Sequence, residues 1–491
     1  MTPSDHPTGL KKIITWIVVG IITTVLIVGV ILVWPLVGKN GPVEYTDIDD
    51  HFKYGSIGSD VTNGLPYWIW KALPVVFPDK LPGEGYQSIG LLYEEGHDLP
   101  IGFSQRRVQV DRVGLNCAVC HTGTVRDTPD SEPRIITTMP ANNLYLQNYI
   151  KFISEVALDP RFSANIMMPY IEQLGAKFNP LEKLVYRYIV IPQTRDALIT
   201  QGARLAFLYN QPDWGPGRVD TFNPYKAIQF NFPMDQLDEK ELIGTSDYPP
   251  IWEQKPREGL QLHWDGDNDS VDERNLSAAL GAGVTPVTAD FEQIKRIADW
   301  LWELPPPPYP YPINAELAST GERIYQNNCA SCHAFGGSKT GTVNPIDQIG
   351  TDPYRLNSYT YQLLSNQNTL YADVSFQGED QRFKHFRKTN GYANMPLDGV
   401  WLRAPYLHNG SVPTLRDLLE APENRPKTYY RGNDVFDQEK VGFVSTVAEE
   451  NDRQFFKFDT TLPGNSNSGH LYGLDLSSEE KEALIEYMKQ L

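Results

Sequence analysis

Every cysteine of this 491-residue chain belongs to one of two short motifs with identical spacing. The motifs read C-x-x-C-H and lie at residues 117–121 and 329–333. Because they use all four cysteines, none remains for a disulfide framework. The chain must therefore fold around packed cores and around whatever the two motifs bind, and its length allows two or three domains.

The spacing of each motif suits covalent attachment of haem. Two thiols three positions apart form thioethers to one haem, and the adjacent imidazole reaches the iron from the same side as proximal ligand. A redox pair or half of a zinc site would not need histidine at the fifth position twice. We therefore expect two covalently bound haems c. Their attachment and proximal residues are Cys117, Cys120, His121, Cys329, Cys332 and His333.

The charge balance excludes one class of partner. The chain has 61 acidic and 43 basic residues and a net charge of −18. Such an acidic surface repels phosphate backbones, so we expect no nucleic-acid partner.

A long apolar run precedes both motifs. Residues 13–37 contain no charged side chain, and a helix of that length exceeds the hydrocarbon core of about 30 Å. A cleaved signal peptide has a shorter apolar core and a small-residue cleavage site, which the Trp34-Pro35 end lacks. Lys11 and Lys12 precede the run and favour a cytoplasmic N-terminus. We expect a single-pass anchor in a bacterial inner membrane, with the haem domains facing the periplasm.

A proline-rich spacer at residues 305–310 divides the rest of the chain. We expect a tail and anchor at 1–39, an N-terminal haem domain with long loops at 40–304, and a C-terminal cytochrome c-like domain at 305–491. Apolar periodicity predicts helices at residues 144–158, 181–207, 291–304, 314–328 and 477–491. The predicted fold is mainly α with extensive loops: two cytochrome-c-like haem domains behind an N-terminal transmembrane helix.

The C-terminal part resembles a class I cytochrome c domain. A helix leads into the second motif, and a last helix opens with Ser477 and Glu480 at capping-box spacing. In that family the two helices cross at small and aromatic residues. Gly321 and Tyr325, four positions apart and so on one face, are the candidates for that crossing.

The second axial ligands decide the function, since an iron with two protein ligands passes electrons and an iron with an open position binds O2 or peroxide. For the second haem the candidates are Met395, His408 and His470. For the first haem no histidine follows the motif until residue 263, and Met139 is a possible ligand or a packing residue. The first haem thus has the weaker case for a second protein ligand.

Several runs resemble the bacterial di-haem cytochrome c peroxidase superfamily, and most closely its rubber oxygenase A-like di-haem cytochromes. The runs lie at residues 112–117, 217–224, 262–266, 404–419, 425–432 and 464–473. The resemblance implies an open, reactive first haem and a low-spin second haem with a distal histidine. The resemblance assigns this distal ligand to His470, because its loop matches the C-terminal run of the subfamily. His408 matches the P-Y-x-H-x-G element of the superfamily, which lies near the haem but need not bind the iron.

The loops between the motifs supply further candidates. Trp252 and Trp264 are the candidate catalytic residues, as walls of an apolar pocket or as an electron bridge, with loop packing as the alternative. Asp265, Asp267 and Asp269 alternate as in a calcium loop, although the glycine and glutamate of an EF-hand are absent. The superfamily often carries calcium between its haems, so calcium is a possible further cofactor.

Two functions follow from these features. The first is a di-haem oxidoreductase that activates O2 or peroxide at the first haem and exchanges electrons with a periplasmic or membrane partner. The alternative is a non-catalytic two-haem electron-transfer cytochrome. Rubber oxygenase is secreted, whereas this chain looks anchored and is shorter, which argues against attack on a bulk insoluble polymer.

Overall fold

The computed structural model describes residues 40–451 and 453–491, and within them helices alternate with many short strands. The expected mainly helical fold is therefore corrected to a mixed one, since eight small antiparallel sheets accompany the helices in these two ranges. The apolar run at 13–37 lies outside the described residues. No described helix is long and apolar enough to cross a membrane.

The regular elements follow in chain order. The helices are α2 (Ile48–Tyr54), α3 (Ser59–Thr62), α4 (Tyr67–Val76), α5 (Leu146–Leu158), α6 (Ala164–Gln173), α7 (Pro180–Val185), the π-helix η5 (Tyr186–Val190), α8 (Ile191–Arg204), α9 (Asn223–Ile228), α10 (Val271–Gly281), α11 (Phe291–Leu301), α12 (Ala315–Asn328), α13 (Ala330–His333), α14 (Ile346–Ile349), α15 (Tyr354–Ser358), α16 (Tyr361–Gln367), α17 (Leu415–Leu418) and α18 (Ser478–Met488). The strands are β1 (Gly41–Pro42), β2 (Leu65–Pro66), β3 (Phe103–Val108), β4 (Val110–Leu115), β5 (Thr122–Val125), β6 (Arg134–Thr137), β7 (Arg218–Asp220), β8 (Thr245–Asp247), β9 (Val343–Pro345), β10 (Ser375–Phe376), β11 (Glu379–Asp380), β12 (Gly391–Ala393), β13 (Thr428–Arg431), β14 (Phe436–Asp437), β15 (Gly442–Phe443), β16 (Glu449–Glu450), β17 (Arg453–Gln454) and β18 (Phe456–Asp459).

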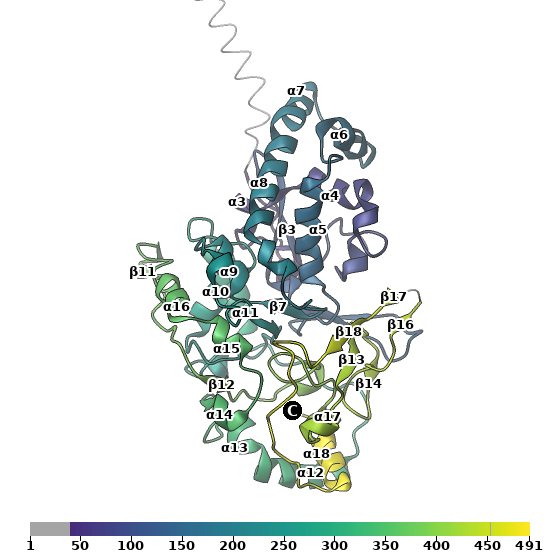
Figure 1. Cartoon of the computed structure of the whole chain (residues 1–491), viewed down its shortest axis with the longest axis vertical. Coiled ribbons are helices and arrows are strands. Elements are labelled where there is room, and N and C mark those ends of the chain that lie inside the picture. The colour runs from purple at the N-terminus through teal and green to yellow at the C-terminus, as the bar shows by residue number, and fades with distance from the viewer. Residues whose placement is uncertain (1–39, 452) are drawn as a thin grey trace, which may run out of the picture.

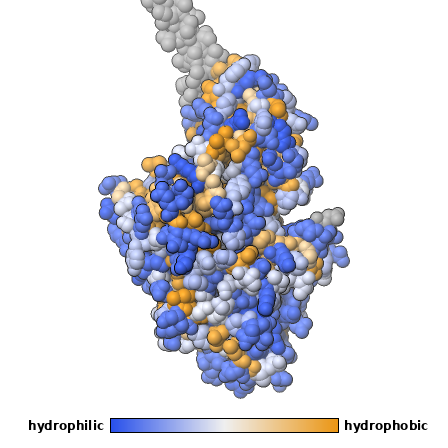
Figure 2. Space-filling model, in the orientation of Figure 1, coloured by the Kyte–Doolittle hydropathy of each residue, from blue (hydrophilic) through white to orange (hydrophobic). Residues whose placement is uncertain are grey.

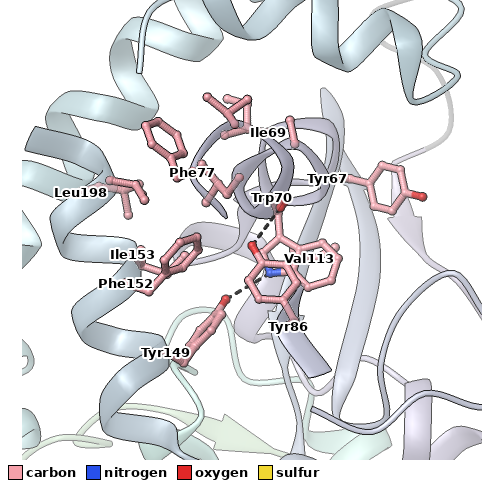
Figure 3. Close-up of a cluster of buried hydrophobic side chains, with 14 of the residues drawn as sticks. Tyr67, Ile69, Trp70, Phe77, Tyr86, Val113, Tyr149, Phe152, Ile153 and Leu198 are labelled. Atoms are coloured by element: carbon pink, nitrogen blue, oxygen red, sulfur yellow. Dashed lines mark hydrogen bonds between the residues drawn. The ribbon is translucent and has the colours of Figure 1, made fainter. Parts of the chain in front are cut away.

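Helices α4 to α8 form an upper lobe at one end of the elongated molecule, and α12, α13 and α18 lie at the other end (Figure 1). The lobe has its own aromatic core (Figure 3). Trp70 stacks on Tyr86 at 4.6 Å and donates its indole N–H to the Tyr149 hydroxyl at 3.2 Å. The polar N–H and O–H groups of these buried rings are hydrogen bonded inside the core. The rings therefore hold the lobe in one arrangement.

The only sheet of more than two strands in the described residues delivers the first motif. Its strand order is β1-β3-β4-β2, and β4 ends directly before Asn116. The Asn116 side chain accepts from the Ala118 N–H at 3.0 Å and donates to the Gly55 carbonyl at 2.9 Å. This pair of bonds ties the turn that carries Cys117 to the chain after α2.

The C-terminal helices cross as the sequence predicts. A Cβ added at Gly321 of α12 would lie 1.8 Å from the Ala483 carbonyl oxygen of α18, and the rings of Tyr325 and Tyr487 lie 5.2 Å apart. The capping box of α18 is also present. Only a glycine allows the two helix backbones to approach this closely.

The proline-rich spacer packs against the C-terminal part. Trp401 donates its indole N–H to the Pro307 carbonyl at 2.9 Å, and its ring lies 5.5 Å from that of Tyr309. Residues before the spacer, Trp252 among them, share one buried cluster with Tyr325. The domain boundary at residue 305 stays a prediction.

We predict that Gly321→Ala destabilises the protein by about 2–3 kcal/mol, because the new methyl group overpacks a backbone contact. Chemical unfolding followed by circular dichroism measures the change. Gly281→Ala is the matched control, because a Cβ there meets no atom within 4 Å and a helical alanine stabilises by up to about 1 kcal/mol. Equal stability of the two variants would contradict the close crossing of α12 and α18.

Candidate haem sites

One helical turn gathers the reactive groups of the second motif. Helix α12 ends at Asn328, and the N–H groups of Cys332 and His333 donate to the Cys329 carbonyl at 3.1 and 3.0 Å. Two thiols and an imidazole therefore project from one turn, as attachment to a single flat group requires.

All four cysteines are free and partly buried. Burial raises the pKa of Cys117 and Cys329 to about 11 and that of Cys120 to about 12. A C-x-x-C redox pair depends on a lowered thiol pKa, and burial acts in the opposite direction on these three thiols. Within the two described ranges, no cluster of three or more His, Cys, Asp or Glu side chains is arranged to hold a metal ion by itself.

A hydrogen bond orients the imidazole of His333 and leaves one of its two ring nitrogens available to a ligand. Its Nδ1 donates to the Met395 carbonyl at 2.7 Å, which leaves Nε2 as the atom that binds a metal. The ring of His470 lies opposite at a centroid distance of 6.2 Å. Metal–imidazole bonds of about 2 Å on both sides of one ion put the ring centroids roughly 6 Å apart. The residues present thus fit an iron held between His333 and His470.

The loop that carries His470 is held by backbone contacts. His470 has a positive φ of 53°, and its N–H donates to the Ile349 carbonyl at 2.8 Å. Arg425 donates to the carbonyls of Asn467 at 2.6 Å and Gly469 at 2.9 Å. Burial, then the neighbouring His333 and Arg425, lower the pKa of His470 to about 3, which favours the neutral imidazole that can bind iron.

The other two candidates lie elsewhere. Met395 gives its carbonyl to the Nδ1 of His333, so its backbone is on the proximal side of the site. His408 stacks on Tyr392 at 3.9 Å rather than facing His333. Burial and nearby arginines hold the pKa of His408 well below its usual value.

The first motif lacks an opposing imidazole. His121 is partly buried, and desolvation followed by the charge of Arg274 lowers its pKa to about 4. The ring next to it is that of Tyr248, at 6.4 Å, and no described histidine ring faces it at that range. Met139 is fully buried, and its terminal atoms press against Gly123. This arrangement differs from the paired imidazoles of the second motif.

A short segment connects the two motifs. Tyr248 lies beside His121, while four residues later Trp252 is buried in the cluster that includes Tyr325 and packs against Cys329. Trp252 donates its indole N–H to the Asp398 carboxylate at 2.8 Å. Residues 248–252 therefore run from one motif to the other.

Asp398 neutralises two buried cations beside Trp252. Its carboxylate pairs with Arg257 at 2.5 Å and with Arg403 at 2.8 Å. The guanidinium of Arg403 lies 5.8 Å from the Trp252 ring. The second aromatic candidate, Trp264, lies in a different cluster, with Ile349 and Tyr392, and donates to the Asp247 carbonyl at 2.8 Å.

The carboxylates of the acidic loop are paired with arginine or histidine side chains. Asp265 pairs with Arg355 at 2.8 Å, and Asp267 lies 2.5 Å from the His263 imidazole. Asp269 pairs with His385 at 2.6 Å. In the described residues these three carboxylates are therefore not gathered around one empty position. Calcium binding stays a prediction from the sequence.

Two protein families match the C-terminal part of the chain. Residues 391–431 match the family described as RoxA-like, cytochrome c-like. Residues 316–399 match cytochrome c oxidase, cbb3-type, subunit III. The matched region is cytochrome c-like and related to RoxA. It implies covalently bound haem c and a redox role.

Two proteins of Sinorhizobium fredii (strain NBRC 101917 / NGR234) are similar to the chain. The uncharacterized protein y4iM is 32% identical over 282 residues, which cover 50% of this chain and 64% of y4iM. The chain thus spans a little under two thirds of y4iM. The uncharacterized protein y4iJ is 25% identical over 548 residues, with 88% of this chain and 89% of y4iJ covered. Neither name states an activity.

Sequence reasoning missed Arg425 and Arg274. Arg425 stands in a run that resembles the family, which was the available signal, yet its bonds to the His470 loop depend on tertiary structure. Arg274 lies in helix α10 without any sequence signal that ties it to the first motif.

We predict that His470→Ala converts one low-spin haem per chain to high-spin, because the iron then loses its second protein ligand. Magnetic circular dichroism of the oxidised protein measures the low-spin content. Met395→Leu and His408→Asn are the matched controls and should keep the wild-type spectrum. If either control loses the low-spin signal while His470→Ala keeps it, the assignment of His470 is wrong.

Proposed function

We propose that the chain is a membrane-anchored di-haem c-type oxidoreductase of the peroxidase or oxygenase type. It resembles the rubber oxygenase A-like branch of the bacterial cytochrome c peroxidase superfamily. Its first haem, on Cys117, Cys120 and His121, activates O2 or peroxide. Its second haem, on Cys329, Cys332 and His333, is the electron-transfer site. The attachment residues were identified above from the motif spacing.

One observation carries this proposal: the two proximal histidines have different surroundings. His333 faces His470 at 6.2 Å, a spacing that fits two ligands on one iron. His121 faces no second imidazole among the described residues. One closed iron and one open iron support an enzyme rather than a simple carrier.

When bound, a haem with one protein ligand supplies an iron that takes O2 or peroxide, and a haem with two supplies a one-electron site. The chain's own residues prepare both positions. Burial keeps the imidazole of His121 neutral, so that its lone pair is available as a ligand. Buried Tyr248 and Ile251 help to exclude water around the first motif.

Trp252 is the proposed electron bridge. It is buried, and it lies at the end of the five-residue segment that begins beside His121. Its hydrogen bond to Asp398 fixes the ring next to the second motif. Trp264 packs against the cluster of Ile349, Leu356 and Tyr392 and, in this proposal, shapes the surroundings of the second haem.

The proposed location is the periplasmic face of a bacterial inner membrane. The support is the uncharged run at residues 13–37 with Lys11 and Lys12 before it. From there the haems would exchange electrons with a periplasmic or membrane partner and meet O2 or peroxide.

Carbon monoxide titration of the reduced protein tests the open site. We expect one CO bound per chain, because only the first iron lacks a second protein ligand. Mass spectrometry of the same sample should give two covalent haems per chain. No CO binding with both haems present would mean that the chain is a two-haem electron carrier.

We predict that Trp252→Phe slows electron transfer between the haems several-fold and leaves CO binding unchanged, because the indole N–H bridge to Asp398 is lost. Flash photolysis of the CO complex of the half-reduced protein measures this rate. Trp214→Phe is the matched control, since Trp214 is equally buried and hydrogen bonded to Gln211 but lies in another cluster. Equal rates in both variants would exclude Trp252 as the bridge.

A further inference from the structure

The upper lobe exposes apolar side chains that its own core does not use. Leu184 and Tyr188 are 53% and 69% exposed, and Ile189 beside them is also exposed. On the neighbouring helix α6, Ile166 and Tyr170 are four positions apart and exposed. Spacings of four put such residues on one helix face. Figure 2 shows hydrophobic residues among the hydrophilic ones on this lobe.

The two helical segments present these residues together. Arg187 in η5 donates to the Asn165 side chain at the start of α6 at 2.9 Å. Tyr188 directly follows the donor, and Ile166 directly follows the acceptor. Helix α6 and segment η5 are therefore neighbours, and we call their exposed apolar residues together with Leu184 the lobe face, defined as Ile166, Tyr170, Leu184, Tyr188 and Ile189.

The lobe face lies in a basic part of an acidic chain. Residues 164–204 contain five basic and three acidic residues, whereas the whole chain has a net charge of −18. Lys177 and Lys183 are exposed beside the face, and Lys183 pairs with Glu172 of α6 at 3.0 Å. A local positive excess with exposed tyrosine and aliphatic side chains is typical of surfaces that meet anionic lipid headgroups.

The apolar N-terminal run joins the fold at this lobe. The Asn40 side chain accepts from the Gln109 N–H at 3.2 Å. Gln109 also lines a cavity of about 310 Å³, together with Trp68, Phe178 and Tyr186. Tyr186 is the first residue of η5. The chain therefore leaves the described structure beside the segment that carries the lobe face.

We infer that the lobe face rests on the surface of an anionic phospholipid bilayer. This inference rests on the proposed membrane anchor and adds a second, peripheral contact to it. The tyrosine and aliphatic side chains enter the headgroup region, and the lysines meet lipid phosphates. Because α12, α13 and α18 lie at the opposite end, the second haem motif then points away from the bilayer (Figure 1).

Site-specific photocrosslinking in the full haem-loaded chain tests this contact. The photoreactive residue p-benzoyl-phenylalanine replaces Tyr188, and in a matched control it replaces Tyr361, which is 74% exposed and lies on α16. Both proteins are mixed with vesicles of phosphatidylcholine and phosphatidylglycerol. We expect at least about fivefold more lipid adducts at position 188, falling when phosphatidylglycerol is omitted.

Equal lipid adducts at both positions, or adducts at position 188 only to a second protein chain, would overturn the inference. Carbonate extraction of the same vesicles reports on the anchor separately, because it releases surface-bound chains and retains spanning ones. A retained chain without adducts at position 188 refutes the lobe contact alone. A released chain with such adducts refutes the anchor alone.

Discussion

The proposed second haem depends on the close approach of the His333 and His470 rings. The two imidazoles come from distant parts of the chain and face each other at 6.2 Å. The His333 ring is oriented by its hydrogen bond to the Met395 carbonyl, whereas for His470 it is the backbone that is held, through its N–H bond to Ile349. The intervening chain folds so that the two rings come together, as the proposed iron requires. Helix α12, which leads into the turn of His333, packs against α18 at Gly321.

Buried charge reinforces both sides of this arrangement. Arg425 donates several bonds to carbonyls of the His470 loop, and Asp398 shares its carboxylate between Arg257 and Arg403. Unpaired buried charges cost several kcal/mol each, so these groups are tolerated only because they are bonded. The same contacts hold Trp252 and the distal loop in place, which links stability to the proposed electron path.

Local sequence signals predicted local structure well. The cap residues Ser477 and Glu480 and the helical segments follow from spacing, and the structure has them. The crossing at Gly321 follows from the resemblance to class I cytochrome c, and the structure has it too. The many small sheets were missed, because two- and three-residue strands carry no clear period. Spacing also left Met395, His408 and His470 open as ligands. Which face of the haem a residue approaches depends on long-range packing, and the Met395 carbonyl bond provides that information.

The central claim is that one chain carries a closed iron and an open iron. Low-temperature electron paramagnetic resonance of the oxidised wild-type protein, with the spins quantified per chain, tests it most directly. The account predicts one low-spin signal from the iron between His333 and His470 and one high-spin signal from the iron on His121. Two low-spin signals per chain would contradict it and would make the protein a two-haem electron carrier.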